Sequence, residues 1–490
     1  MAHRLPVELW TQIALYLEDE VSFLPIYARV CRQWQPVFER LIYRKLKVES
    51  EEGAQREKGA VSLSQFEYLM PGSTQCRRSF LRQLDYTITT PYEIVDCRAM
   101  KLEDQRYSEK NPVRDANNQA FSKAMRALFE ILETWDAELK VTLAITVTKG
   151  RDLMQEPEAK EVEDLYRWQT VLDGEQWVIP PYHARFPDEG LPLSNICCID
   201  ELLFEENDSY QGVWSGAALK VAEHCVALRR LYLDLEEMVR PDHLAYIRDR
   251  RQAALACAFP KLPTLRSFEL DGKPFEDFSL NLRNLSLNLR ELKLTMVAVE
   301  LDFLFPLDQA GDPTPESLSL YWPHLETLTL NALSMCLPSG EWLFDREDPE
   351  DLPDPATASS FAIFSTQLMV DETEYFRGIM RIGHFHRLYT SVGYAAQRMP
   401  RLKTIDTSMV QTPSTQLRFE CGRGAVDGLV RRSRRPILSF NSQSGYIPDE
   451  RVAAARGFGL GDLEIEDLGA DDVFHHVYVN VVLDQFPVNQ

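Results

Sequence analysis

The chain lacks the features of several protein classes. Its 490 residues contain no apolar run near the ~20 residues that a membrane-spanning helix needs. Its nine cysteines include no C-x-x-C pair, which favours free thiols in a reducing compartment over disulfides or a zinc site. The opening Met-Ala-His-Arg-Leu-Pro lacks the apolar core and small-residue cleavage site of a secretory signal. We therefore expect a protein of the cytoplasm, the nucleus or both, with no membrane partner.

Positive charge is also scarce. Lys and Arg number 53 against 75 Asp and Glu, a formal net charge of −22 at pH 7. Such a surface repels phosphate backbones, so we expect no nucleic-acid partner. One dense basic cluster, Arg431-Arg432-Ser433-Arg434-Arg435, stands out. It fits a nuclear import signal, a patch that reads acidic or phosphorylated motifs, or a solvated loop paired with the protein's own acid.

Catalytic signatures are missing as well. The sequence holds no G-x-S-x-G elbow, P-loop, H-E-x-x-H or protein-kinase motif. The glycines of 457–461 are followed by Asp462 and Glu464, which would repel a phosphate, so a turn is favoured. The histidine pairs at 384/386 and 475/476 point to different faces of a helix and a strand. We expect no metal, no cofactor and no catalytic residue. An enzyme within residues 60–490 is an alternative that a pocket with clustered ionisable groups would reveal.

The first 48 residues contain three short helical patterns. Leu9, Ile13 and Leu17 recur every four residues, and Pro6 suits the first turn of that helix. Residues 23–32 and 36–46 show further apolar spacing. Three helices of about ten residues cannot enclose a large core. We therefore expect part of their apolar surface to be buried against something else.

This stretch resembles the F-box, the module that docks substrate receptors onto the Skp-type adaptor of Skp–cullin–F-box ubiquitin ligases. The resemblance implies that the matching residues make or support the interface with the adaptor, and through it with cullin. These residues are Leu5, Pro6, Leu9, Ile13, Leu17, Leu24, Val30 and Trp34. Between Leu17 and Val30 the chain is two residues longer than the family pattern, which leaves the contacts of 18–23 open. A small bundle packed on the rest of the chain is the alternative.

A second pattern recurs further along the chain. Its form is L-x-x-L-x-L, in which L is an apolar residue, usually leucine at the first position, and x is any residue. Copies start at Leu81, Ile199, Leu228, Leu265, Leu289, Leu325 and, in degenerate form, Leu402. The alternating tail predicts a half-buried strand. The phrase resembles the strand segment of leucine-rich repeats, although the spacing is irregular and only Asn331 matches the asparagine that follows the strand in regular repeats.

Helical patterns lie between these phrases, at 117–135, 213–228, 242–258 and 372–399. Strands that alternate with helices favour a parallel sheet lined by helices. The expected fold is therefore α/β: a small N-terminal three-helix F-box followed by an irregular leucine-rich-repeat-like solenoid with a curved parallel sheet and outer helices.

The same patterns predict the domain boundaries. The expected parts are an F-box at 1–48, a polar linker at 49–62, a repeat array at 63–410 and a C-terminal capping segment at 411–490 with a strand at 476–483. The repeat array is expected to carry insertions at 101–114, 306–315 and 345–360.

The two resemblances together imply a function. A chain with an F-box in front of a repeat array resembles the substrate-recognition adaptors of Skp–cullin–F-box E3 ubiquitin ligases, in style those of filamentous fungi. Such a protein is not an enzyme. It would dock the Skp-type adaptor by its F-box and an unknown protein substrate by its repeat surface, for ubiquitin-dependent protein degradation. The alternative is an F-box scaffold that binds the adaptor without delivering substrates.

Overall fold

The fold is known from a computed structural model of the chain. It describes residues 9, 12–13, 24–32, 34–50, 59–70, 75–90, 112–149, 182–187, 193–204, 211–234, 262–271, 279–295, 297, 299–333, 337, 344–346, 378–409, 415–420, 437–442, 447–456, 460–462, 464–470 and 475–482. The chain divides into two compact units, residues 1–233 and 234–490.

The first unit is built on a parallel sheet. The described strands run in the order β2-β1-β3-β4-β6-β8. Their bounds are β1 Lys45–Glu49, β2 Val61–Ser62, β3 Gln83–Thr90, β4 Val141–Lys149, β6 Ile199–Phe204 and β8 Arg230–Asp234. A separate parallel pair is formed by β5 (Tyr182–Ala184) and β7 (Gln211–Val213). The helices are α2 Leu24–Ala28, α3 Gln35–Ile42, α4 Leu63–Leu69, α5 Gln75–Arg78, α6 Pro112–Glu133 and α8 Ser215–Glu223.

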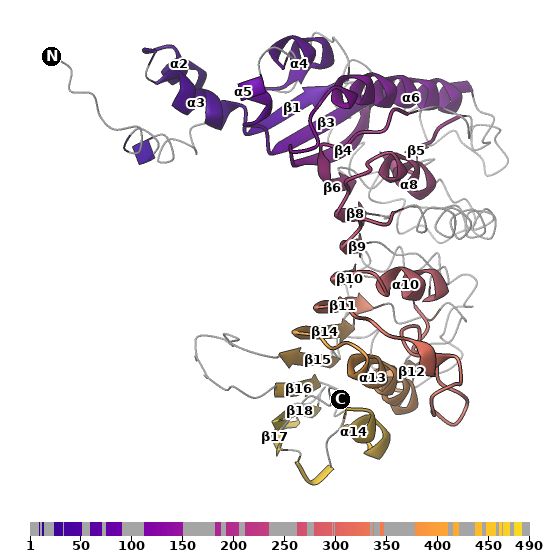
Figure 1. The fold of residues 1–490 in the computed structure, drawn as a ribbon. Helices are drawn as coiled ribbons and strands as arrows, with labels where there is room; N and C mark the ends of the chain where they lie inside the picture. The colour runs from indigo at the N-terminus through magenta and orange to yellow at the C-terminus, as the bar shows by residue number, and fades with distance from the viewer. Residues whose placement is uncertain are drawn as a thin grey trace, which may run out of the picture. The chain divides into compact units, whose positions relative to one another are not determined.

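The strands of this unit pair so that their apolar positions lie opposite one another. Leu84 lies opposite Leu46 on one side and Leu143 on the other, while Leu202 lies opposite Leu231. Because alternate side chains of a strand point to opposite faces, this register collects the apolar residues on one face. Helices α6 and α8 lie along the same side of the strands (Figure 1). The core of the unit is therefore between the sheet and these helices.

The second unit repeats this arrangement and then changes it. Strands β9 (Ser267–Asp271), β10 (Glu291–Thr295), β11 (Thr327–Leu333) and β14 (Thr404–Met409) are parallel. The sheet continues with the antiparallel strands β15 Thr415–Glu420, β16 Ile437–Ser442, β18 His475–Val482 and β17 Glu464–Ala470. Strands β12 (Phe344–Arg346) and β13 (Gly378–Met380) form a small antiparallel pair. The helices are α10 Ser279–Ser286, α13 Ile382–Gln397 and α14 Glu450–Arg456, with short 3₁₀ turns η8 Ser317–Ser319 and η10 Leu460–Asp462.

Every strand expected from the repeated phrase is present, so the α/β class and the parallel sheet are confirmed. The seven phrases lead into β3, β6, β8, β9, β10, β11 and β14. In the second unit Leu292 stacks between Phe268 and Leu328, and Leu294 between Leu270 and Leu330. These side chains are at most 1% exposed. The leucines of the phrase are thus core residues.

Several expected boundaries need correction. The third N-terminal helix ends at Ile42 rather than at Leu46, because Lys45-Leu46-Lys47-Val48-Glu49 alternates and forms β1. The end of the expected F-box range 1–48 and the start of the expected linker 49–62 therefore lie in a strand that pairs with β3. The end of that linker range forms β2.

Other expected elements shift or cannot be placed. Helix α6 begins at Pro112, inside the expected insertion 101–114, because proline suits a first helical turn. Helix α13 begins at Ile382, and β13 occupies 378–380 within the range expected to be helical. The expected strand at 476–483 is β18. The expected helix 242–258 and residues 347–360 lie outside the described residues.

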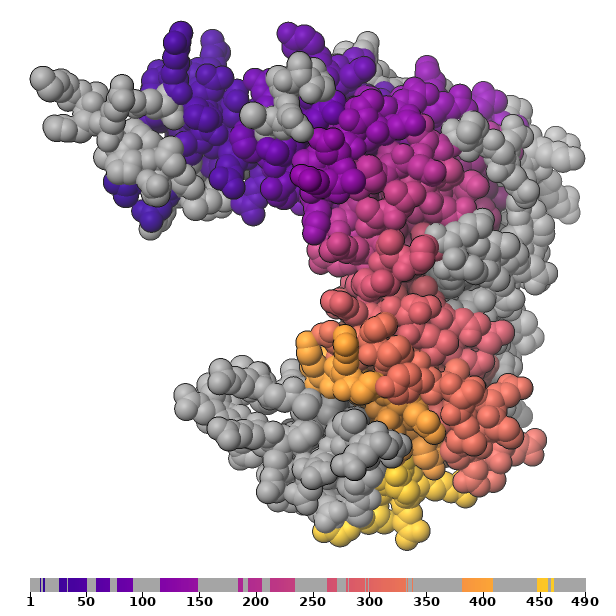
Figure 2. All heavy atoms as spheres, in the orientation of Figure 1, coloured from indigo at the N-terminus to yellow at the C-terminus, as the bar shows by residue number. Residues whose placement is uncertain are grey.

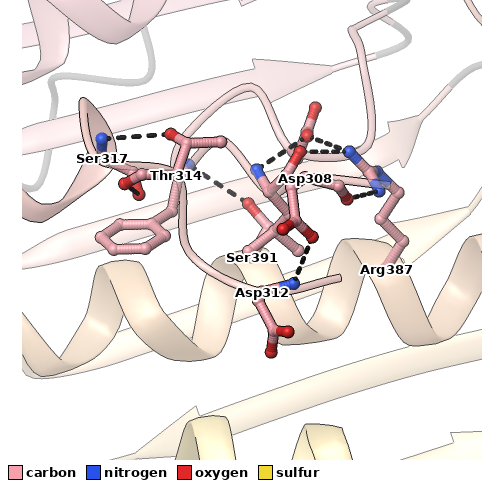
Figure 3. Close-up of polar contacts among 9 residues, drawn as sticks. Asp308, Asp312, Thr314, Ser317, Arg387 and Ser391 are labelled. Carbon is pink, nitrogen blue, oxygen red and sulfur yellow. Dashed lines mark hydrogen bonds and ion pairs between the residues drawn. The ribbon is translucent and has the colours of Figure 1, made fainter. Parts of the chain in front are cut away.

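Residues 306–315, expected to be an insertion, form a loop that α13 holds (Figure 3). The Arg387 guanidinium donates from Nη2 to Asp302 Oδ2 at 2.6 Å and to the Leu307 carbonyl at 2.7 Å. Its Nη1 donates to the Asp308 carbonyl at 2.8 Å. The Ser391 hydroxyl accepts from the Phe305 N–H at 3.2 Å. One charged side chain and one hydroxyl of α13 therefore satisfy backbone groups of a segment with no regular strand or α-helix.

Where helices α13 and α14 pack together, His386 of α13 lies beside Asp449, the residue that caps α14. Asp449 Oδ1 accepts from the backbone N–H groups of Arg451 at 3.1 Å and Val452 at 2.9 Å, which caps α14. His386 Nδ1 lies 3.7 Å from the same oxygen. Burial lowers the pKa of His386 from its ordinary 6.5; Asp449 opposes this effect and Arg451 adds to it. Neutral histidine is thus the form that the fold favours.

This shift predicts a pH dependence of stability. Below pH 6.5 the unfolded chain binds the histidine proton more readily than the folded chain does, because the folded pKa is the lower one. The stability that neutral His386 contributes is therefore complete above pH 6.5 and lost as the pH falls toward the folded pKa. We expect the melting temperature of the wild type to fall more than that of His386→Gln between roughly pH 8 and roughly pH 5. Equal slopes for the two proteins would contradict this assignment.

Candidate partner-binding surfaces

The N-terminal helices build a small core of their own. Pro36 lies in the first turn of α3, where a missing N–H costs no hydrogen bond. Val37 and Phe38 are buried and are covered by the partly buried Tyr27, Ala28, Trp34, Leu41 and Ile42. The ring of Phe38 lies 5.4 Å from that of Tyr27 and 5.3 Å from that of Trp34, centroid to centroid. Aromatic pairs at such distances stabilise a core beyond their buried area.

Other apolar side chains of the same segment are exposed. Leu9 is 43% exposed, Ile13 37%, Ile26 59% and Val30 58%. Ile26 lies in α2, and Val30 follows it four residues later in the turn that ends this helix. The small aromatic core thus buries Val37 and Phe38, while these four aliphatic side chains of the first 30 residues are exposed to solvent. Such residues mark a surface that another molecule can cover.

The residues of the F-box resemblance fall into four groups. Leu9, Ile13 and Val30 are exposed, as an interface requires. Trp34 packs against Phe38 and Tyr27, so it supports the helix pair rather than projecting from it. Leu24 begins α2. Outside the described residues lie Leu5, Pro6 and Leu17. The sequence interpretation missed Ile26, which its spacing of four from Val30 could have indicated.

The helix pair is tied to the body of the first unit by α5. Arg77 Nη2 donates to Glu39 Oε1 of α3 at 3.0 Å, and its guanidinium carbon lies 5.1 Å from the centre of the Tyr43 ring. Tyr43 is buried, which raises the pKa of its phenol. The neighbouring Arg78 donates to the carbonyls of Met70 and Thr134. One turn of helix therefore joins the N-terminal helices to the body of the first unit, at the indigo end of the chain in Figure 2.

The outer face of the sheet in the first unit carries polar pairs across neighbouring strands. Lys45 Nζ lies 3.0 Å from Asp85 Oδ2. Glu201 Oε2 accepts from the Thr142 hydroxyl at 2.8 Å and lies 3.2 Å from Arg230 Nη2. The register places Glu201 opposite Thr142 and Arg230, and Lys45 reaches diagonally to Asp85 from its place opposite Gln83. A partner on this face would contact hydrogen-bonding groups rather than an apolar surface.

Among the described residues, no three His, Cys, Asp or Glu side chains are grouped as a metal site would need. Burial raises the pKa of Cys198 to about 12 and also raises that of Cys225, so both are protonated at neutral pH. They fill core space. The cluster 431–435 and the glycines at 457 and 459 lie outside the described residues.

In the part of the chain that the structure covers, no helix is long and apolar enough to span a bilayer. No protein-family model matches the chain, and no curated protein is significantly similar to it in sequence. What this chain does must therefore be inferred from its own residues and their geometry.

The difference in burial between Phe38 and Val30 predicts that substitutions at these two positions differ in their effect on stability. Phe38→Ala should destabilise the helix pair by about 3–5 kcal/mol, because the ring is fully buried. Val30→Asp should change its stability by no more than about 0.5 kcal/mol, because the side chain is exposed. Limited trypsin digestion reports the difference through cleavage at the exposed Arg29 and Arg32. Faster cleavage in Val30→Asp than in Phe38→Ala would show that the prediction is wrong.

Proposed function

We propose that this protein is the substrate receptor of a Skp–cullin–F-box ubiquitin ligase. Its N-terminal segment is an F-box that binds the Skp-type adaptor. The contacts come from the exposed Leu9, Ile13, Ile26 and Val30, with Trp34 as a support. The matching Leu5, Pro6, Leu17 and Leu24 belong to the same interface by their place in the motif.

The observation that carries this proposal is the contrast between two sets of apolar side chains. The leucines of the sheet, such as Leu84 and Leu292, are 0% exposed. Ile26 and Val30 are more than half exposed although they flank a filled aromatic core. Complete burial of one aliphatic side chain contributes about 1.5–3 kcal/mol. An adaptor that covers this surface gains enough apolar contact to offset the cost of association.

The rest of the chain serves to hold a target protein. Its phrases stack one strand per repeat with helices along one side, which supports an irregular leucine-rich-repeat-like solenoid. A receptor of this kind catalyses no bond change. It raises the effective concentration of the target near the ubiquitin-charged enzyme and fixes its orientation. The cytoplasm and the nucleus, where these ligases act, are the compartments that follow.

Adaptor binding can be tested with a matched pair of variants. Purified full-length protein is titrated with a Skp-type adaptor by calorimetry, as wild type, as Ile26→Glu/Val30→Glu and as Val226→Glu. The last variant places one glutamate, against two in the double variant, at a 49% exposed valine outside the N-terminal segment. A loss of at least about 2 kcal/mol, more than tenfold in affinity, is expected for the double variant alone. A wild type that ignores the adaptor, or a double variant that binds normally, would contradict the proposal.

A second experiment separates a receptor from a scaffold. The tagged protein is recovered from cells, and its partners are identified with and without the Ile26→Glu/Val30→Glu change. Recovery of cullin and a ring-finger subunit, lost in the double variant, supports the ligase receptor. Recovery of the adaptor alone indicates a scaffold that does not deliver substrates.

A further inference from the structure

In the second unit, one row of residues lines the edge where the parallel strands begin. It consists of the residue that follows the first leucine of each phrase: Arg266, Arg290, Glu326 and Lys403. We call this edge, together with Arg401, the entry rim. The Arg290 N–H donates to the Arg266 carbonyl at 2.6 Å, and the Glu326 N–H to the Arg290 carbonyl at 2.7 Å. The Lys403 N–H donates to the Glu326 carbonyl at 2.8 Å.

These backbone bonds fix the spacing of the row. Successive residues lie on adjacent strands, which are about 4.7–4.9 Å apart. Strands β9, β10, β11 and β14 follow one another in this order (Figure 1). The side chains at the rim are thus held at regular intervals by the sheet itself. A groove or loop is not needed to bring them together.

The rim concentrates positive charge in an acidic protein. Lys403 Nζ contacts the carboxylate of Glu326, and its side chain is 64% exposed. This contact and the nearby Arg290 and Arg401 lower the pKa of Glu326. Arg290 and Arg401 are exposed as well. One lysine therefore contacts this carboxylate and two arginines help to lower its pKa, whereas the whole chain carries a net charge of −22.

Two acidic residues of the neighbouring strands have partners of their own. Glu291 Oε2 accepts from the Ser267 hydroxyl at 3.0 Å, and Glu269 is paired with Lys293. Arg266 donates from Nη1 to the carbonyls of Pro263 and Leu265. Among the described contacts, Glu326 is the carboxylate that Lys403, Arg290 and Arg401 share.

We propose that the entry rim binds an acidic segment of a partner protein. Guanidinium groups bind carboxylates through two parallel hydrogen bonds, which fits Arg290 and Arg401 to Asp or Glu side chains. An exposed pair such as Lys403 with Glu326 contributes little stability, so an incoming carboxylate can compete for the lysine. A long polyanion such as a nucleic acid would meet the negative charge of the remaining surface, whereas a short acidic peptide meets the rim alone.

This inference adds the chemistry of the target to the proposed function and depends on it only in calling the partner a ubiquitination target. The binding itself needs no adaptor. Loss of adaptor binding and loss of peptide binding are therefore distinguishable results, obtained with different variants and different probes.

The test measures fluorescence anisotropy of a labelled peptide rich in Asp and Glu, with the same peptide carrying Asn and Gln as the reference. Full-length wild type is compared with Arg290→Glu/Lys403→Glu. The matched control is Lys123→Glu/Arg126→Glu, which reverses two exposed charges on α6. We expect the wild type to prefer the acidic peptide and to bind it less tightly as salt rises. The rim variant should lose about tenfold in affinity and the control should keep it.

Three results would overturn the proposal. They are equal binding of the acidic and amide peptides, equal losses in the rim and control variants, and tighter binding of a single-stranded oligonucleotide than of the acidic peptide. Melting temperatures check that the variants are folded. If charge reversal prevents folding, Arg290→Gln/Lys403→Gln replaces it, and unchanged binding by that variant likewise overturns the proposal.

Discussion

The in-register stacking of parallel strands is the constraint on which the rest of the structure depends. Within each unit the repeated phrase pairs leucine with leucine or with another apolar residue, as Leu292 does with Leu328. One face of each sheet must then be covered by helices, because it is continuously apolar. The opposite face receives the alternate polar residues, and the residue that precedes each strand is brought to one edge. The register of the strands therefore determines which residues lie in the core, on the outer face and at the entry rim.

The N-terminal helices are stabilised in a different way. Helices α2 and α3 are held by side-chain contacts: the aromatic cluster around Phe38 and the ion pair between Arg77 and Glu39. These contacts fill a small core but leave Ile26 and Val30 exposed. The apolar side chains of the leucine phrases are thus buried, whereas aliphatic side chains in the segment that resembles an F-box are exposed.

The sequence predicted the strands that the phrase marks, because the phrase has a period of two and a leading leucine. Strand β4 was missed since Lys140 stands where the leading leucine belongs, and β1 was missed since Leu46 also continues the helical spacing of Leu41 and Ile42. The exposure of Ile26 could not be predicted, because burial depends on what packs against a residue. The entry rim also needed the structure, because Arg290 and Lys403 are far apart in sequence and only the register places them around Glu326.

We propose that another subunit binds the exposed apolar side chains of the N-terminal helices. Hydrogen–deuterium exchange of the full-length protein, alone and with a Skp-type adaptor, shows whether it does. We expect slower exchange on adding the adaptor in the segment that holds Leu9, Ile13 and residues 24–42, with unchanged exchange in the strands of both units. Protection confined to the sheets, or no protection anywhere at saturating adaptor, would contradict it.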